Sequence, residues 1–140
     1  MPDGTLVAGC LDNVLVLDVR TRAVTATLGE SKYRAITDLA VLPNGLLAAS
    51  YIDSFIRLWD VGARTCVATL AGHKSDVQAL AVLPGGLLAS GGYDATVRLW
   101  DTASRACVGI LTGHTDYITA LATLPDGRLV SASNDGSVRV

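Results

Sequence analysis

The 140-residue chain is poor in the residues on which many site chemistries depend. It has two histidines, three cysteines and one methionine, and no two cysteines form a CxxC pair. So few ligands, with no convergent spacing, argue against a metal site. An odd number of unevenly spaced cysteines gives no disulfide framework and favours a reducing compartment. We therefore expect no metal, no cofactor, and a cytoplasmic or other reducing intracellular location.

Charge and long apolar runs are scarce as well. Charged residues make up 17% of the chain and the formal net charge is -2, which predicts no nucleic-acid partner. The apolar stretches are strand-sized and broken by Gly, Pro or charge, so we expect no membrane-spanning helix and no membrane partner. The first residues, MPDGTLVAG, do not resemble a signal peptide. Half of the residues are nevertheless hydrophobic, enough to bury a core.

The chain is instead rich in internal repetition with one fixed period. The markers that recur at the same spacing are Pro2, Pro43, Pro84 and Pro125, Trp59 and Trp100, Cys66 and Cys107, and His73 and His114. Each marker recurs after 41 residues. A fixed period of this length indicates stacked supersecondary units. It divides one segment, 1–140, into repeats 1–28, 29–70, 71–111 and 112–140, of which the first and last are incomplete.

Short segments rich in Val, Leu, Ile and Ala alternate with turn residues such as PDG, PNG and PGG. No segment of ten residues has the apolar spacing of a helix, so the sequence predicts an all-β protein. Pro84-Gly85-Gly86 and Gly91-Gly92-Tyr93-Asp94 are expected to reverse the chain. The strands predicted for the complete repeat are Asp76–Val82, Leu87–Gly91, Thr96–Asp101 and Arg105–Leu111.

Several elements of repeat 71–111 occur in a recognisable order. They are Gly72-His73, the LeuPro-Gly-Gly turn, Ser90, Asp94, and the ValArgLeuTrpAsp sequence that ends at Asp101. In this order the repeat resembles the WD-repeat β-propeller family, and the resemblance covers the whole chain. It implies a partial β-propeller of four-stranded antiparallel blades, with two complete blades flanked by two incomplete ones.

The resemblance also implies a polar network inside the blades. In the third repeat it would join His73, Ser90, Asp94 and Trp100, with the Asp accepting from the His ring and the hydroxyl reached by the indole N–H. The fourth repeat keeps His114, Ser131 and Asp135. The second keeps Asp53 and Trp59, has no histidine, and has Ala49 in place of Ser90. Apolar packing must therefore hold the blades that lack the full set.

The strands, labelled a to d outward from the channel, read bcd, abcd, abcd and abc, which makes fourteen. Fourteen is half of the 28 strands in a seven-bladed ring and suggests a two-fold dimer. The order of the strands argues against this dimer. At each junction the abc end of one chain would meet the bcd start of the other, which makes two incomplete blades and not one complete blade. Unpaired edges invite self-association, so we expect a part of a longer propeller, or a fragment that completes a ring with another chain.

Most other polar residues have simple structural interpretations. Without converging partners the two histidines are expected to be structural, not catalytic or metal-binding. Cys66 and Cys107 are interpreted as small buried hydrophobes. Asp60 and Asp101 are expected to cap turns, and their action as an acid–base pair is disfavoured because they lie on separate blades. We therefore predict that the chain is not an enzyme.

Partners of the family commonly dock on the face where the d-to-a and b-to-c loops emerge. Carried over by position, the residues implied for partner binding are Asp76, Gln78, Tyr93, Tyr117, Thr119 and Asn134, with Thr37 and Ile52 as matches in the second repeat. Exposed aromatics there would act as rigid anchors, although Tyr93 and Tyr117 could simply line the loops. Lys32, Tyr33 and Arg34 replace the Gly-His loop of the second repeat, as a contact site or a solvated loop.

These observations favour a non-enzymatic scaffold that presents blade loops to a protein or peptide partner. The alternatives are a structural fragment that binds nothing itself and an enzyme. An enzyme would need acidic, histidine or metal-ligating residues that converge in the channel, and the sequence provides no such set.

Overall fold

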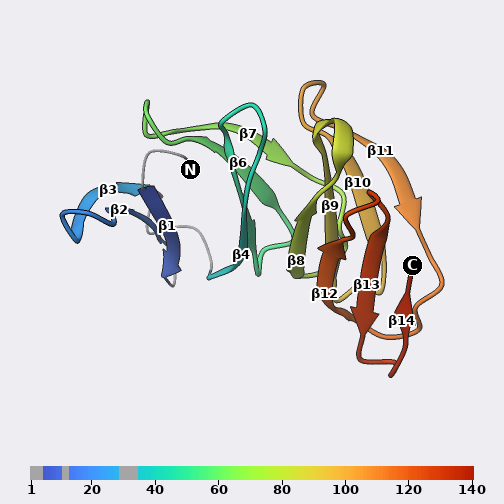
Figure 1. Cartoon of the computed structure of the whole chain (residues 1–140). Coiled ribbons are helices and arrows are strands. Elements are labelled where there is room, and N and C mark those ends of the chain that lie inside the picture. The colour runs from blue at the N-terminus through green and yellow to red at the C-terminus, as the bar shows by residue number, and fades with distance from the viewer. Residues whose placement is uncertain (1–4, 11–12, 29–34) are drawn as a thin grey trace.

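A computed structural model describes residues 5–10, 13–28 and 35–140 of the chain. Within these residues, strands form four antiparallel sheets that follow one another in chain order (Figure 1). The first sheet holds β1 (Thr5–Cys10), β2 (Asn13–Asp18) and β3 (Ala23–Leu28). The second holds β4 (Ile36–Val41), β5 (Leu47–Tyr51), β6 (Ile56–Asp60) and β7 (Thr65–Leu70).

The other two sheets repeat the arrangement. The third holds β8 (Val77–Val82), β9 (Leu87–Gly92), β10 (Val97–Asp101) and β11 (Ala106–Leu111). The fourth holds β12 (Ile118–Thr123), β13 (Leu129–Ser133) and β14 (Val138–Arg139). We number the sheets blades 1 to 4. The all-β prediction of two four-stranded blades between two three-stranded ones is confirmed, and the described residues form an open arc.

Turn chemistry explains the first reversal in the second, third and fourth repeats. Gly45, Gly86 and Gly127 occupy the same repeat position after the recurring prolines and have φ values of 85°, 83° and 88°. A side chain is disfavoured at such φ values, so glycine is the residue that suits this turn. In blade 3 the turn closes as a single 3₁₀ turn over Pro84–Gly86, the one helical element among the described residues.

The second reversal lies in the expected segment, at Tyr93 and Asp94, and is closed by a hydrogen bond from the Ala95 N–H to the Gly92 carbonyl at 3.3 Å. Gly91 and Gly92 themselves belong to β9, and the left-handed residue of this turn is Ala95, with φ of 59°. The two glycines are needed for close approach instead. A Cβ on Gly91 would lie 2.4 Å from Ile118 of blade 4, and one on Gly92 would lie 2.5 Å from the carbonyl oxygen of Asp76.

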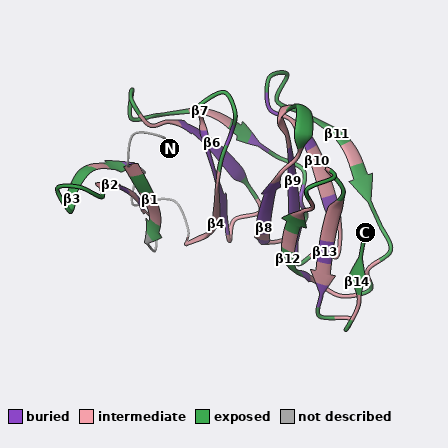
Figure 2. Ribbon diagram, in the orientation of Figure 1, coloured by how far each residue is buried: buried purple, intermediate pink, exposed green. Residues whose placement is uncertain are grey.

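The core lies between the blades, not within one of them. One cluster joins Ile56 and Leu70 of blade 2 to Leu88 and Trp100 of blade 3. A second joins blade 1 to blade 2, and a third joins blade 3 to blade 4. Buried residues therefore concentrate on β5, β6, β8 and β9, whereas β3, β11 and β14 are largely exposed (Figure 2). Each blade is stabilised by the apolar area that its neighbour removes from water.

Cys66 and Cys107 are exposed, so the interpretation of both as buried hydrophobes is wrong. They lie on β7 and β11, the last strands of their sheets, far from the neighbouring blade. An outer strand pairs with only one other strand of its sheet. At these two positions the side chain faces solvent. The sequence period locates equivalent positions but does not say which side of the strand is covered.

The free edge of β8 is bound by side chains from both neighbouring blades. The Asp38 carboxylate accepts from the Leu80 N–H at 2.8 Å. The Thr37 hydroxyl donates to the Val77 carbonyl, and that of Thr123 donates to the Val82 carbonyl at 2.8 Å. Backbone groups at a strand edge that would otherwise need water are thus satisfied within the protein.

Candidate functional site

A continuous chain of hydrogen bonds runs through blade 3. The Trp100 Nε1–H donates to the Ser90 hydroxyl at 2.8 Å, and Ser90 lies 2.7 Å from the Nε2 of His73. The Nδ1 of His73 lies 2.9 Å from a carboxylate oxygen of Asp94. Because the indole can only donate and the carboxylate can only accept, the Ser90 O–H donates to Nε2 and the Nδ1–H donates to Asp94. All four side chains named by the sequence are thus in contact.

Burial determines the protonation of this network. It lowers the pKa of His73 below the ordinary value of 6.5, although the hydrogen bond and charge of Asp94 act in the opposite direction. Burial alone would raise the pKa of Asp94, but hydrogen bonds from Lys74, Thr96 and His73 together lower it. The histidine is therefore neutral and the aspartate is ionised at neutral pH.

The order Ser–His–Asp is also that of a hydrolase triad, but Ser90 is not placed to react. Its side chain is fully buried, and its oxygen already accepts the indole N–H. A nucleophile needs access to a substrate as well as a base. The network in blade 3 is therefore a structural one.

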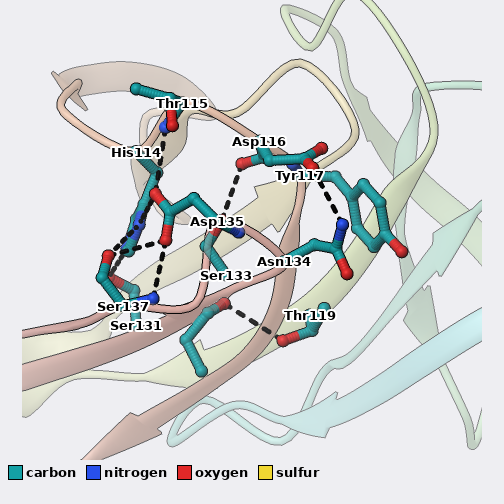
Figure 3. A network of polar contacts seen from close by, with 11 residues as sticks. His114, Thr115, Asp116, Tyr117, Thr119, Ser131, Ser133, Asn134, Asp135 and Ser137 are labelled. Atoms are coloured by element: carbon teal, nitrogen blue, oxygen red, sulfur yellow. Dashed lines mark hydrogen bonds and ion pairs between the residues drawn. The ribbon is translucent and has the colours of Figure 1, made fainter.

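Blade 4 repeats two of the three contacts, those of the histidine with the serine and with the aspartate (Figure 3). The Nδ1 of His114 lies 2.8 Å from Asp135, and its Nε2 lies 2.9 Å from the Ser131 hydroxyl. Asp135 also accepts from the hydroxyl of Ser137 at 2.6 Å and from the Thr115 N–H at 3.0 Å. The hydrogen bond from Ser137, followed by those from His114 and Thr115, holds the pKa of Asp135 well below its usual range.

Blade 2 is held together by different residues. Asp53 makes a two-point ion pair with Arg57, at 2.7 and 3.1 Å, and the guanidinium stacks over the ring of Tyr51 at 4.5 Å. Burial raises the pKa of the Tyr51 hydroxyl, and the neighbouring Trp59 opposes the rise. Tyr51 and Trp59 belong to the same core cluster between blades 1 and 2.

Sequence reasoning missed Tyr51 and Arg57. Tyr51 is fully buried and stands where the complete repeat has Gly92. The sequence did contain a signal for Tyr51. It is a bulky ring at a position where the next repeat has glycine, and its own repeat has no histidine. The ring occupies space beside the tryptophan that the histidine fills in blade 3.

The loop positions proposed for partner binding meet at the boundary between blades 3 and 4. The rings of Tyr93 and Tyr117 are 4.7 Å apart at an angle of 45°. Tyr93 is 47% exposed, although its backbone N–H is fixed to the Asp76 carbonyl at 2.9 Å. Asn134 is exposed and is bound through its own N–H to the Tyr117 carbonyl at 3.0 Å.

An acidic residue that the sequence did not single out completes this surface. Asp116 accepts from the side-chain amide of Asn134 and from the Tyr117 N–H, each at 2.8 Å (Figure 3). We call Asp76, Tyr93, Asp116, Tyr117 and Asn134 the tyrosine surface. It combines two amphipathic rings with polar groups whose backbone is held in place.

The remaining predicted positions have other environments. Gln78 on β8 is half-buried, and Thr119 on β12 is exposed and donates to the Ala132 carbonyl at 3.2 Å. Thr37 contacts Ser50 within blade 2 and donates to the Val77 carbonyl of blade 3, and Ile52 is half-buried. Lys32, Tyr33 and Arg34 lie outside the described residues.

Asp101 and Asp60 cap the turns that follow their strands. Asp101 accepts from the N–H groups of Ala103 and Ser104 at 2.9 and 3.3 Å, and Asp60 accepts from the Ala63 N–H at 2.8 Å. Over residues 5–10, 13–28 and 35–140, no three His, Cys, Asp or Glu side chains gather as a metal site. The same part of the chain holds no helix long and apolar enough to cross a bilayer.

Radially arranged, four-stranded antiparallel sheets with an indole at the blade boundary define a β-propeller. The family model described as WD domain, G-beta repeat matches residues 23–60, 64–101 and 105–140. The chain belongs to this WD40 family, whose propellers generally act as non-enzymatic scaffolds that bind proteins. The matched units have the same period as the sequence repeats, but each begins at an outer strand instead of before an inner one.

Many solved structures share the fold. One is the crystal structure of the WD40 β-propeller domain of Doa1, with a TM-score of 0.90 and 23% sequence identity. The alignment covers 99% of this chain and 47% of that one, so the chain spans about half of that protein's length. No curated protein sequence matches the chain.

Proposed function

We propose that the chain is a non-enzymatic interaction scaffold whose tyrosine surface binds a protein or peptide partner. The observation that carries the proposal is the contact of Tyr93 with Tyr117 across a blade boundary. Two rings from different blades form one aromatic patch, in which Tyr93 is exposed and Tyr117 is half-buried. Packed aromatics with a polar tip dominate binding energies at protein interfaces. Membership of a family of protein-binding scaffolds supports the same conclusion.

The backbone of the surface supports recognition with little loss of entropy. Tyr93 and Asn134 are each tied through their N–H groups to the strand beside them. Groups held before binding cost less to order when the partner arrives. Asp76 and Asp116 beside the rings favour a partner segment with donors or positive charge.

A random peptide library displayed against the wild-type chain tests this proposal. Affinities of the selected peptides are then measured for Tyr93→Ala, Tyr117→Ala and the control Val108→Ala, whose side chain is 55% exposed on β11. We expect the tyrosine variants to bind about tenfold or more weakly, as interface anchors do, and Val108→Ala to bind normally. Melting temperatures should stay close to wild type. Two results would contradict the assignment: peptides that bind both tyrosine variants as tightly as the wild type, or a large fall in the melting temperature of these variants.

Ring completion with another polypeptide is a second candidate, favoured by the outward faces of the end blades. Leu6 is 54% exposed and Val138 is 66% exposed, whereas their counterparts Leu88 and Val97 are 0% and 3% exposed between blades. Apolar positions of this kind are covered in a packed propeller. Size-exclusion chromatography with light scattering checks this: one closed oligomer supports it, and a monomer at high concentration argues against it.

A further inference from the structure

The tyrosine surface carries a carboxylate for which the described part of the chain provides no partner. Asp76 is half-buried, and its carboxylate makes no hydrogen bond and no ion pair with another described residue. Lys74 is exposed two residues earlier in the same loop, yet no ion pair joins these two described residues. The Asp116 carboxylate, by contrast, already accepts from the Tyr117 N–H and from Asn134. A partly buried, unpaired carboxylate favours a cation that brings several N–H donors.

This carboxylate belongs to a residue that neighbours an exposed aromatic ring. The Tyr93 N–H donates to the Asp76 carbonyl at 2.9 Å, which places the two residues side by side. Tyr93 is 47% exposed, and its ring packs on that of Tyr117. In the part of the chain that the structure describes, no cation lies over either of these rings. The surface thus presents two aromatic rings and a negative charge without a positive group in contact with them.

The same kinds of group occur together in blade 2, where they hold a cation. Asp53 makes its two-point ion pair with Arg57 at 2.7 and 3.1 Å. The guanidinium carbon of Arg57 lies 4.5 Å from the centre of the Tyr51 ring and 5.6 Å from that of Phe55. Two aromatic rings and one carboxylate therefore hold one arginine within this protein.

The chemistry of the tyrosine surface suits arginine better than lysine. A guanidinium is planar, so it can stack on an aromatic face while it donates two parallel N–H groups to one carboxylate. An ammonium is more strongly hydrated and acts as a point charge. Tyr93 offers an exposed ring for stacking, and both oxygens of the Asp76 carboxylate are available among the described residues.

We propose that the tyrosine surface binds an arginine side chain of the partner, with the guanidinium stacked on the Tyr93 ring and paired with the Asp76 carboxylate. The partner is therefore a polypeptide segment with an accessible arginine. This inference rests on the proposed function, because it names the chemical group that the same surface takes. The partner's arginine has in this site the role that Arg57 has within blade 2.

NMR titration of the full chain tests the proposal with three capped tripeptides. Their central residue, flanked by glycines, is arginine, citrulline or lysine, and citrulline keeps the shape of arginine without its charge. We expect the arginine peptide to shift the backbone amide signals of Asp76, Tyr93 and Tyr117. It should bind about tenfold more tightly than the citrulline peptide, the usual difference for a hydrogen bond to a charged group. The lysine peptide should bind with an affinity between the two.

Variants of the carboxylate locate the charge that is recognised. In Asp76→Asn the preference for arginine over citrulline should disappear, while the citrulline peptide binds as before. Asp126→Asn is the matched control, because it removes the same charge from an exposed aspartate beyond the other end of β12, and it should keep the preference. Asp76→Arg should bind a glutamate tripeptide more tightly than the arginine one. Such a reversal is a gain of binding that loss of structure cannot produce.

Three results would overturn the assignment of arginine. They are equal binding of the arginine and citrulline peptides by the wild type, a lysine peptide that binds as tightly as the arginine peptide, and an unchanged preference in Asp76→Asn. Absence of binding up to the solubility limit of the arginine peptide would overturn it as well.

The library experiment separates this failure from a failure of the proposed function. Peptides selected against the wild-type chain should share an arginine, and its replacement by citrulline should weaken them by the same factor as in the tripeptides. Selected peptides that need both tyrosines but no arginine would overturn the present inference and leave the proposed function in place. Selected peptides that bind the tyrosine variants normally would contradict the proposed function itself.

Discussion

Blades 2 and 3 have the same arrangement of strands and a buried tryptophan at the same repeat position. They differ in the side chains that surround this tryptophan. In blade 3 the indole N–H reaches Ser90, and the hydroxyl is held by His73 and Asp94. In blade 2 Trp59 and Tyr51 share one core cluster, and the Arg57 guanidinium lies over the Tyr51 ring. Both arrangements end on the same tight-turn aspartate, paired with histidine in one blade and with arginine in the other.

The comparison shows that a blade of this fold does not require histidine. Each of the two blades buries an indole in a cluster between blades and pairs the aspartate of its tight turn, with histidine in blade 3 and with arginine in blade 2. In blade 2 a buried tyrosine supplies the bulk beside the indole.

The largest effect is expected from removal of the shared indole. Trp100→Ala should lower the free energy of unfolding by about 3–5 kcal/mol, because it leaves a cavity between blades 2 and 3. Trp59→Ala, at the boundary of the three-stranded blade 1, should cost less, since fewer strands cover it. Chemical denaturation measures both. If Trp100→Ala lowers the free energy of unfolding by no more than an ordinary surface substitution does, the indole is not part of the core.

A smaller difference should separate Ser90→Ala from Tyr51→Phe. Ser90→Ala breaks bonds to both Trp100 and His73, whereas Tyr51→Phe keeps the ring and its packing in the core cluster. A buried polar group left without its partner costs about 1–3 kcal/mol, so Ser90→Ala should be the more destabilising variant by about 1 kcal/mol. Equal losses in denaturation would mean that the histidine adds nothing to blade 3.

The smallest expected effect is a dependence on pH that His73 gives to blade 3 and that blade 2, whose described residues include no histidine, lacks. Because the pKa of His73 is lowered by burial, the unfolded chain binds its proton more readily. Stability is therefore retained above about pH 6.5 and falls as the pH is lowered from 6.5, by at most about 1.4 kcal/mol per pH unit for one proton. The lowered pKa values of Asp94 and Asp135 add a further loss below the ordinary aspartate range.

Thermal melting between pH 7 and pH 5 measures this slope. The variant His73→Gln should flatten it, and Tyr51→Phe should leave it as steep as in the wild type. Stability that rises on acidification would contradict the assigned protonation.

The fixed period of the sequence was sufficient to predict the blades. Strand ends in the complete repeat differ from the predicted ones by at most one residue. The contacts of His73, Ser90, Asp94 and Trp100 also follow from repeat position, because a network inside one blade depends only on local strand geometry.

Contacts between blades could not be predicted in this way. The need for glycine at position 91 depends on Ile118, which lies in the sheet of the next blade. The exposure of Cys66 depends on what covers an outer strand, and the pairing of Tyr93 with Tyr117 depends on the angle between two blades. Tyr51 could not be predicted from its repeat position, because a tyrosine has this role only in a blade that lacks the histidine.

The ties along the edge of β8 limit how freely the repeats could be exchanged. Asp38 binds the Leu80 N–H of the next blade, but one and two repeats later the same position holds Ala79 and Ala120. Replacing blade 2 by a copy of blade 3 would keep every strand in phase and still remove this bond, because the copy has alanine in place of Asp38. The copies share a period but are not interchangeable.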